Sequence, residues 1–161
     1  NAILSEGQAS RIEGAWWQFS LTQRSEKEPS ALGLVRLARN RAGALEMKGS
    51  AWHPDGSLSA RYWREAVREK EDGSAFYYWK GERPLHPDAP QLEGTGEIRL
   101  ESAERATGYF TTRGDDVNAR TAGVYLRADA DEIAVLDGHD DRQRVALIAD
   151  RLVHWKSILS V

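Results

Sequence analysis

Cysteine is absent from the 161-residue sequence, and methionine (one) and phenylalanine (three) are scarce. Without cysteine the chain has no disulfides, no thiolate zinc site and no cysteine nucleophile, which fits a reducing compartment, and we expect a cytoplasmic location. No run approaches the roughly 20 apolar residues of a membrane-spanning helix, and the first residues resemble no signal peptide. The net charge of −3 argues against binding to long nucleic acids or to anionic membrane surfaces.

The sequence begins with Asn1 rather than Met, which suggests a piece of a longer protein. We expect residues 1–11 to form an N-terminal extension, with a possible tag remnant at 1–2. Any contact with a membrane would come from sequence missing upstream of residue 1. The length is that of one core-forming domain. We predict this domain over 12–128 and a helical segment over 129–161.

In contrast, the sequence contains six tryptophans and fourteen glycines. Eight short runs rich in apolar and aromatic residues alternate with turn signals such as Pro54-Asp55-Gly56, where proline fixes φ and glycine accepts positive φ. Strands of this length joined mostly by hairpin-length turns predict a mainly β fold, either an antiparallel sandwich or an antiparallel barrel. The predicted strands span 12–21, 31–38, 44–52, 58–65, 74–80, 94–100, 107–113 and 123–127.

In the last part of the chain, the spacing of apolar residues changes from that of strands to that of helices. Asp129 followed by Glu132 forms a helix-start box, and Asp140 or Asp141 can cap a second helix. Apolar residues then recur three and four positions apart, which predicts an amphipathic C-terminal helix that packs on the barrel or on a partner. The apolar stripe consists of Val145, Ile148, Leu152, Trp155 and Leu159.

Motifs that carry known chemistry are missing. The four histidines have no metal-binding spacing, and the sequence contains neither a nucleophile elbow nor a P-loop. Gly94-Thr95-Gly96 precedes a strand-like run, so it predicts a bulge or a close strand approach rather than a dinucleotide site. The acidic cluster from Asp137 to Asp141 could hold a cation, but a helix start explains it better. We therefore expect no enzyme, no catalytic residue, no metal and no cofactor.

Aromatic and basic residues interleave along the predicted strands. Because residues two apart share a strand face, Arg61 lies beside Trp63, and Tyr109 lies on the same face as Arg113. If these faces point into the barrel, the lumen offers flat rings and guanidinium groups, which suit a planar anionic ligand. The alternative is that the aromatics pack across strands while the arginines cover the outside. The predicted ligand-binding residues are Trp52, Arg61, Trp63, Tyr78, Tyr109 and Arg113.

Several segments also resemble a known family. Gly14-Ala15-Trp16 resembles the G-x-W signature of lipocalins and other calycin barrels. The wider series resembles the soluble barrel domain of two-transmembrane effectors in bacterial cyclic-oligonucleotide antiphage (CBASS) systems. It continues through Tyr77-Tyr78-Trp79-Lys80-Gly81, Gly94 to Ile98, Gly108-Tyr109-Phe110 and Gly123 to Arg127. The resemblance implies an eight-stranded antiparallel up-and-down barrel of the lipocalin type. It also implies that the lumen binds a cyclic dinucleotide and that membrane-spanning helices lie upstream.

The leading hypothesis is therefore a non-enzymatic barrel that senses a cyclic di- or oligonucleotide in antiphage signalling and changes its self-association as a homo-oligomer. A calycin-type carrier of an apolar small molecule is the first alternative, and it predicts an uncharged lumen. A protein-interaction module whose barrel is filled by its own side chains is the second. The orientation of Arg61 and Arg113 distinguishes the nucleotide sensor from the carrier.

Overall fold

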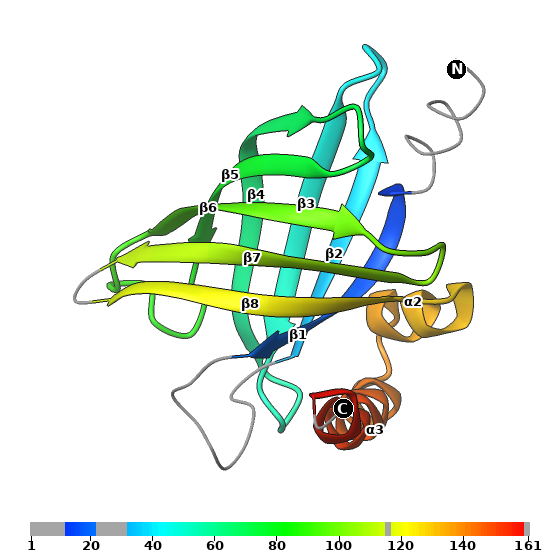
Figure 1. Cartoon of the computed structure of the whole chain (residues 1–161). Helices are drawn as coiled ribbons and strands as arrows, with labels where there is room; N and C mark the ends of the chain where they lie inside the picture. The colour runs from blue at the N-terminus through cyan, green and yellow to red at the C-terminus, as the bar shows by residue number, and fades with distance from the viewer. Residues whose placement is uncertain (1–11, 22–31, 115–116, 160–161) are drawn as a thin grey trace.

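The computed structural model describes residues 12–21, 32–114 and 117–159. The extension predicted over 1–11 lies outside these residues. Eight antiparallel strands pair in chain order, and β1 pairs with β8 to close a barrel (Figure 1). The strands are β1 (Gly14–Leu21), β2 (Leu32–Arg39), β3 (Leu45–Trp52), β4 (Leu58–Glu69), β5 (Ala75–Glu82), β6 (Leu92–Leu100), β7 (Arg105–Gly114) and β8 (Val117–Arg127).

This architecture confirms the predicted mainly β, up-and-down barrel. Each predicted run overlaps one observed strand, although β4 runs on to Glu69 and β8 begins earlier, at Val117. The extra residues of β4 follow a register shift between Arg64 and Ala66. Such a bulge turns the strand without ending it, and no turn signal marks it in the sequence.

Large apolar side chains fill one end of the barrel, which we call the closed end. It holds Ile12, Trp16, Leu37, Leu45 and Ile98, each at most 4% exposed. The Trp16 indole donates to the Ile12 carbonyl at 2.9 Å, and the Arg127 guanidinium stacks over the ring, 4.0 Å from its centroid. The indole is fully buried with Arg127 on one face, and its one polar group has a partner.

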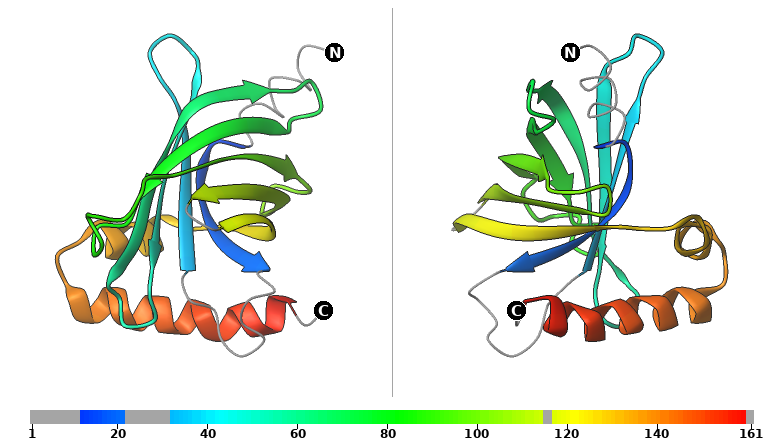
Figure 2. Two further views of the ribbon diagram at one scale, coloured as in Figure 1. Left: turned by 90° about the vertical axis from the view of Figure 1, so that its left-hand side faces the viewer. Right: turned by 45° about the vertical axis from the view of Figure 1, so that its right-hand side comes forward.

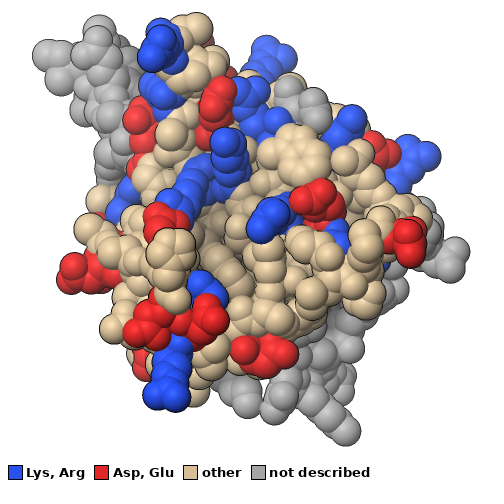
Figure 3. Space-filling model, turned by 180° about the vertical axis from the view of Figure 1, so that it is seen from behind, with Lys and Arg blue, Asp and Glu red and all other residues tan. Residues whose placement is uncertain are grey.

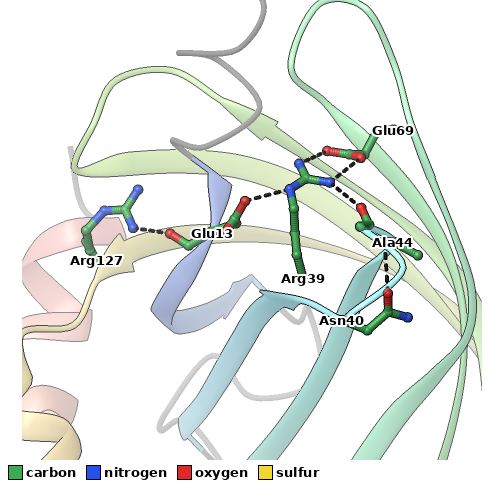
Figure 4. Close-up of polar contacts among 7 residues, drawn as sticks. Glu13, Arg39, Asn40, Ala44, Glu69 and Arg127 are labelled. Carbon is green, nitrogen blue, oxygen red and sulfur yellow. Dashed lines mark hydrogen bonds and ion pairs between the residues drawn. The ribbon is translucent and has the colours of Figure 1, made fainter.

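Gly14 is required at the start of β1. Its φ is +122°, and a Cβ built there would lie 2.6 Å from an Arg127 guanidinium nitrogen. That nitrogen donates to the Glu13 carbonyl at 2.6 Å (Figure 4). Any side chain at position 14 would be strained and would displace Arg127. The Gly14-Ala15-Trp16 motif thus has a structural basis in the contact between the two strands that close the barrel.

Arg39 ties three segments together at the same end (Figure 4). Its guanidinium lies 2.6 Å from carboxylate oxygens of both Glu13 and Glu69, and it donates to the Gly43 carbonyl at 3.0 Å. The hydrogen bond from Arg39 lowers the pKa of the Glu69 carboxyl, and the two carboxylates raise the pKa of Arg39. The start of β1, the β2–β3 turn and the end of β4 are fixed by one side chain.

Two helices follow the barrel, α2 (Ala130–Asp137) and α3 (Asp141–Leu159). The predicted capping box is confirmed, since the Glu132 amide donates to Asp129 at 2.8 Å and the Asp129 amide donates to Glu132 at 3.2 Å. Asp140 caps α3 by accepting from two backbone amides. None of the helices in the described part of the chain is long and apolar enough to cross a membrane.

The helices pack against the outside of β1, β2 and β3, where they form a second apolar cluster (Figure 2). Ile148 is fully buried, and Leu152 and Trp155 pack beside it, as the predicted stripe requires. The side chain of Leu159 lies outside the described residues. The Glu132 carboxylate accepts from the Trp17 indole at 2.9 Å and lies 3.0 Å from Arg151 of α3. One carboxylate therefore joins the barrel to both helices.

Candidate ligand-binding site

The half of the barrel away from Trp16 is hollow, and we call it the open end. It contains a cavity of about 310 Å³ to which seven of the eight strands contribute. Small residues such as Ser20, Gly33, Ala51, Ala60 and Gly81 occupy the positions where the closed end carries large ones. The open end is a concave, mostly apolar surface with a few polar groups, which is typical of a small-molecule site.

Aromatic rings form one wall of this cavity. Tyr62 and Trp79 meet edge to face with centroids 6.2 Å apart, and Trp79 meets Phe110 in the same way at 6.4 Å. Tyr62 lies directly over Gly49, where a Cβ would be only 1.9 Å from its ring. Glycine at position 49 therefore makes room for the tyrosine.

A buried polar network lies beside the aromatic wall. The Tyr62 hydroxyl donates to the Gln18 side-chain oxygen at 2.8 Å, and the Gln18 amide donates to the Tyr125 hydroxyl at 3.3 Å. Tyr125 also shares a hydrogen bond with Tyr77. Burial raises the pKa of Tyr125 to about 12 and raises those of Tyr62 and Tyr77 as well. All three hydroxyls are therefore protonated and uncharged at neutral pH.

The cavity is nearly free of formal charge. Of the sixteen described residues that line it, Arg61 alone is charged. Arg61 lies near the start of β4, at the edge of the open end, and its side chain is exposed. Arg113 is exposed too and does not line the cavity. The lumen thus lacks the paired guanidinium groups that the sequence predicted.

The inward orientation that the nucleotide hypothesis requires of the aromatic and cationic faces is wrong, and the alternative, in which these residues lie outside, is closer. Trp52 belongs to the outer apolar cluster beneath the helices. Tyr62 and Phe110 point inward instead of their neighbours Trp63 and Tyr109, and Arg61 borders the cavity only at its edge. Residues two apart do share a strand face, as the alternation predicts. The error was to place the aromatic and cationic face in the lumen because its chemistry suits an anionic ligand. A barrel interior instead takes the uncharged face, because an unpaired buried cation costs several kcal/mol.

The six predicted residues fall into separate places on the outer surface. Trp52, Arg61 and Trp63 come together in a groove beside α2. Tyr78 and Tyr109 share a shallow site on β5 and β7, where the Tyr78 hydroxyl donates to Glu93 at 2.6 Å. Arg113 stands opposite Glu93 in the β6–β7 register.

Sequence reasoning missed the residues that do line the lumen, chiefly Gln18, Tyr62, Tyr77, Trp79 and Phe110. A signal for Tyr62 was present. Its cross-strand partners on both sides are glycines, Gly49 and Gly81. Gly94-Thr95-Gly96 carries a similar signal, since a Cβ at Gly96 would lie 2.3 Å from the Tyr77 ring. The predicted close strand approach is confirmed at Gly94, where a Cβ would lie 1.8 Å from the Thr111 carbonyl oxygen on β7.

The acidic cluster around the start of α3 has structural partners. Asp137 pairs with Arg36, and Asp141 pairs with Arg144. Asp140 accepts two backbone hydrogen bonds as the helix cap. Among the residues that the structure describes, no group of three metal-ligating side chains comes together.

Comparisons with known proteins place the fold in the class of small closed β-barrels. A redesigned β-barrel (b11L5F_LGL) superposes with a TM-score of 0.55 at 15% identity, and the match covers 76% of this chain and 96% of the barrel. Pallilysin (Tp0751) of Treponema pallidum matches with a TM-score of 0.41 at 11% identity, over 80% of this chain and 92% of its own. No protein-family model and no curated protein matches the sequence. The likeness concerns the fold alone.

Proposed function

We propose that this barrel binds a small, mostly apolar molecule in its open end, without transforming it. The observation that carries the proposal is the cavity of about 310 Å³, walled by Tyr62, Trp79 and Phe110 and almost uncharged. Burying an apolar ligand there would gain about 25 cal/mol for each Å² removed from water. An uncharged lumen is what the apolar-carrier hypothesis predicts.

The polar network supports a ligand with one hydrogen-bond acceptor. The hydrogen bond between Tyr77 and Tyr125 raises the pKa of Tyr77, so Tyr77 is the donor and its proton is already used. Gln18 lines the cavity, and its amide uses one of its two protons on Tyr125. A carbonyl or hydroxyl oxygen of the ligand would accept the second Gln18 proton and orient the molecule.

A cyclic di- or oligonucleotide is the second candidate, as the family resemblance implies. The position of Arg61 at the edge of the cavity favours it, because a phosphate could meet that guanidinium while a base enters among the rings. Ser20 and Thr112 would add hydroxyl groups near the same edge. In this case the chain would be a cytoplasmic sensor whose self-association changes with the ligand, anchored by sequence outside the chain.

A titration with the uncharged dye N-phenyl-1-naphthylamine tests the proposal. We expect a saturable rise in dye fluorescence and competition by uncharged apolar molecules, with no competition by cyclic di-AMP or cyclic GMP–AMP. Ala60→Phe would fill the cavity and weaken dye binding by about tenfold or more. Ala66→Phe is the matched control, since Ala66 is exposed on the outside of the same strand.

The outcomes separate the two candidates. Loss of dye binding in Ala60→Phe but not in Ala66→Phe supports the apolar site. Displacement of the dye by a cyclic dinucleotide, lost in Arg61→Gln, would replace it with the nucleotide sensor. Equal dye binding by both phenylalanine variants would show that the dye binds elsewhere and would overturn the proposal.

A further inference from the structure

A second concave site lies on the outside of the barrel, between β2, β3, β4 and the end of α2. We call it the outer groove. Its volume is about 460 Å³, and its lining includes Arg36, Lys48, Trp52, Arg61, Trp63 and Asp137. These strands lie at the back of the view in Figure 1, and Figure 3 shows that back face, with Lys and Arg side chains around its hollowed centre. The groove opens on the outside of the barrel and the cavity lies in the lumen, but Arg61 and Tyr62 border both.

Three cations gather in the groove because their strands are in register. Arg36 is the cross-strand partner of Lys48, and Arg61 is the partner of Ser50, two residues further along β3. All three side chains therefore lie on the same outer face. The groove thus concentrates positive charge on a chain whose net charge is −3.

The acidic residues nearby leave most of this charge uncompensated. Arg36 forms a two-pronged pair with Asp137, at 2.5 and 3.1 Å, which joins β2 to α2. Within the described part of the chain, neither Lys48 nor Arg61 forms an ion pair, even though Glu82 is the cross-strand partner of Arg61. Among the residues that line the groove, three cations and one carboxylate leave a surplus of two positive charges. Such a surplus on a concave surface attracts an anion.

Aromatic surface stands next to the cations. Trp63 is the cross-strand partner of Lys48 and is half-buried, so part of its ring faces the groove. Trp52 is 8% exposed and also lines the groove. An indole beside an ammonium and a guanidinium group can stack on a ring while the cations bind an attached anionic group.

We propose that the outer groove binds a small aromatic anion of the nucleoside monophosphate type, with the phosphate on Lys48 and Arg61 and the base against Trp63. Arg36 is held by Asp137 and forms the wall of the site rather than the phosphate contact. This proposal does not rest on the ligand proposed for the lumen, although the two sites share Arg61 and Tyr62. It also accounts for three of the six residues that the sequence predicted as ligand-binding, on the face opposite to the one expected.

Two-dimensional ¹H–¹⁵N NMR of the tryptophan indoles tests this site, with adenosine 5′-monophosphate, adenosine and inorganic phosphate as probes. We expect the monophosphate to shift the Trp63 indole resonance, identified by its loss in Trp63→Phe, and to leave that of Trp79 in the lumen unchanged. The double variant Lys48→Gln/Arg61→Gln is expected to weaken binding by about tenfold or more, because both charge-assisted contacts are lost. Arg68→Gln, an exposed cation on the same strand outside the groove, is the matched control.

The separate probes decide each part of the proposal. Weaker binding of both adenosine and phosphate than of the monophosphate supports a combined stacking and anion site. Binding of phosphate as tight as that of the monophosphate would overturn the stacking part. Absence of any shift at millimolar monophosphate would overturn the site, as would equal losses in the double variant and in Arg68→Gln. Thermal unfolding of each variant establishes that an observed loss is not caused by unfolding.

Discussion

The two ends of the barrel are built from the same eight strands and yet differ in almost every physical respect. At the closed end, Trp16, Leu37 and Leu45 are at most 4% exposed, and Arg39 joins three chain segments through ion pairs and a hydrogen bond. At the open end, the corresponding positions hold alanine, glycine and serine around a cavity of about 310 Å³. A single strand such as β3 contributes to both, with Leu45 at one end and Ala51 at the other.

This difference shows how a small barrel can hold a cavity and still fold. Interior contacts are concentrated at one end, where tight packing gains dispersion and hydrophobic free energy. The opposite end forgoes those contacts and keeps its shape through the closed hydrogen-bonded ladder. We expect stability to depend mainly on the closed end and binding mainly on the open end.

The largest expected effect is that of Trp16→Ala. Removing a fully buried indole, together with the surface on which Arg127 stacks, should lower the free energy of unfolding by about 3–5 kcal/mol. Urea denaturation followed by circular dichroism measures it. If the variant does not fold, Trp16→Phe gives a smaller loss of the same sign. A loss under about 0.5 kcal/mol for either variant would contradict a stability centre at this end.

Gln18→Leu acts at the boundary between the two ends. It removes the acceptor of Tyr62 and the donor to Tyr125, so we expect a loss of about 1–3 kcal/mol. Tyr62→Phe in the same background should restore part of that loss, because it removes the hydroxyl left without a partner. A double-mutant cycle in urea measures the coupling, and strict additivity would show that the network is not cooperative.

Arg39→Gln is expected to cost about 0.5–1 kcal/mol at pH 7, because both of its ion pairs are partly exposed. The native pKa of Glu69 is lowered, so its contribution is present above the unfolded pKa and is lost as the pH falls through the native value. The difference between wild type and variant should therefore shrink below about pH 4. A constant difference from pH 7 to pH 3 would argue against the ion pairs as its source.

Thr112→Val at the open end should have the smallest effect, within about 0.5 kcal/mol, because the residue is partly exposed and lines open space. The same urea measurement applies. A loss comparable with that of Gln18→Leu would remove the contrast between the two ends.

Strand number and order could be predicted because turn residues and strand-forming runs are local features of the sequence. Closure is not a local feature, and a barrel rather than a sandwich followed from the family resemblance. Both helix starts were predictable as well, since Asp129 and Asp140 act through nearby backbone amides. The direction of each strand face was not local. In Arg61-Tyr62-Trp63, either Tyr62 or its two neighbours can face the lumen. Tyr62 faces it because burying Arg61 would cost free energy and because the cross-strand glycines make room for the tyrosine ring. The candidate site was therefore predicted with correct groupings and the wrong face.

The stack of Arg127 on Trp16 also has a kinetic consequence. It joins the first strand to the last, and the β1–β8 ladder can form only after almost the whole chain has been assembled. Contacts this distant in sequence raise the contact order and slow folding. During synthesis on a ribosome, the first seven strands would form an open sheet with two free edges until β8 is available. Closure by β8 is then the step that ends the exposure of those edges to pairing with other chains.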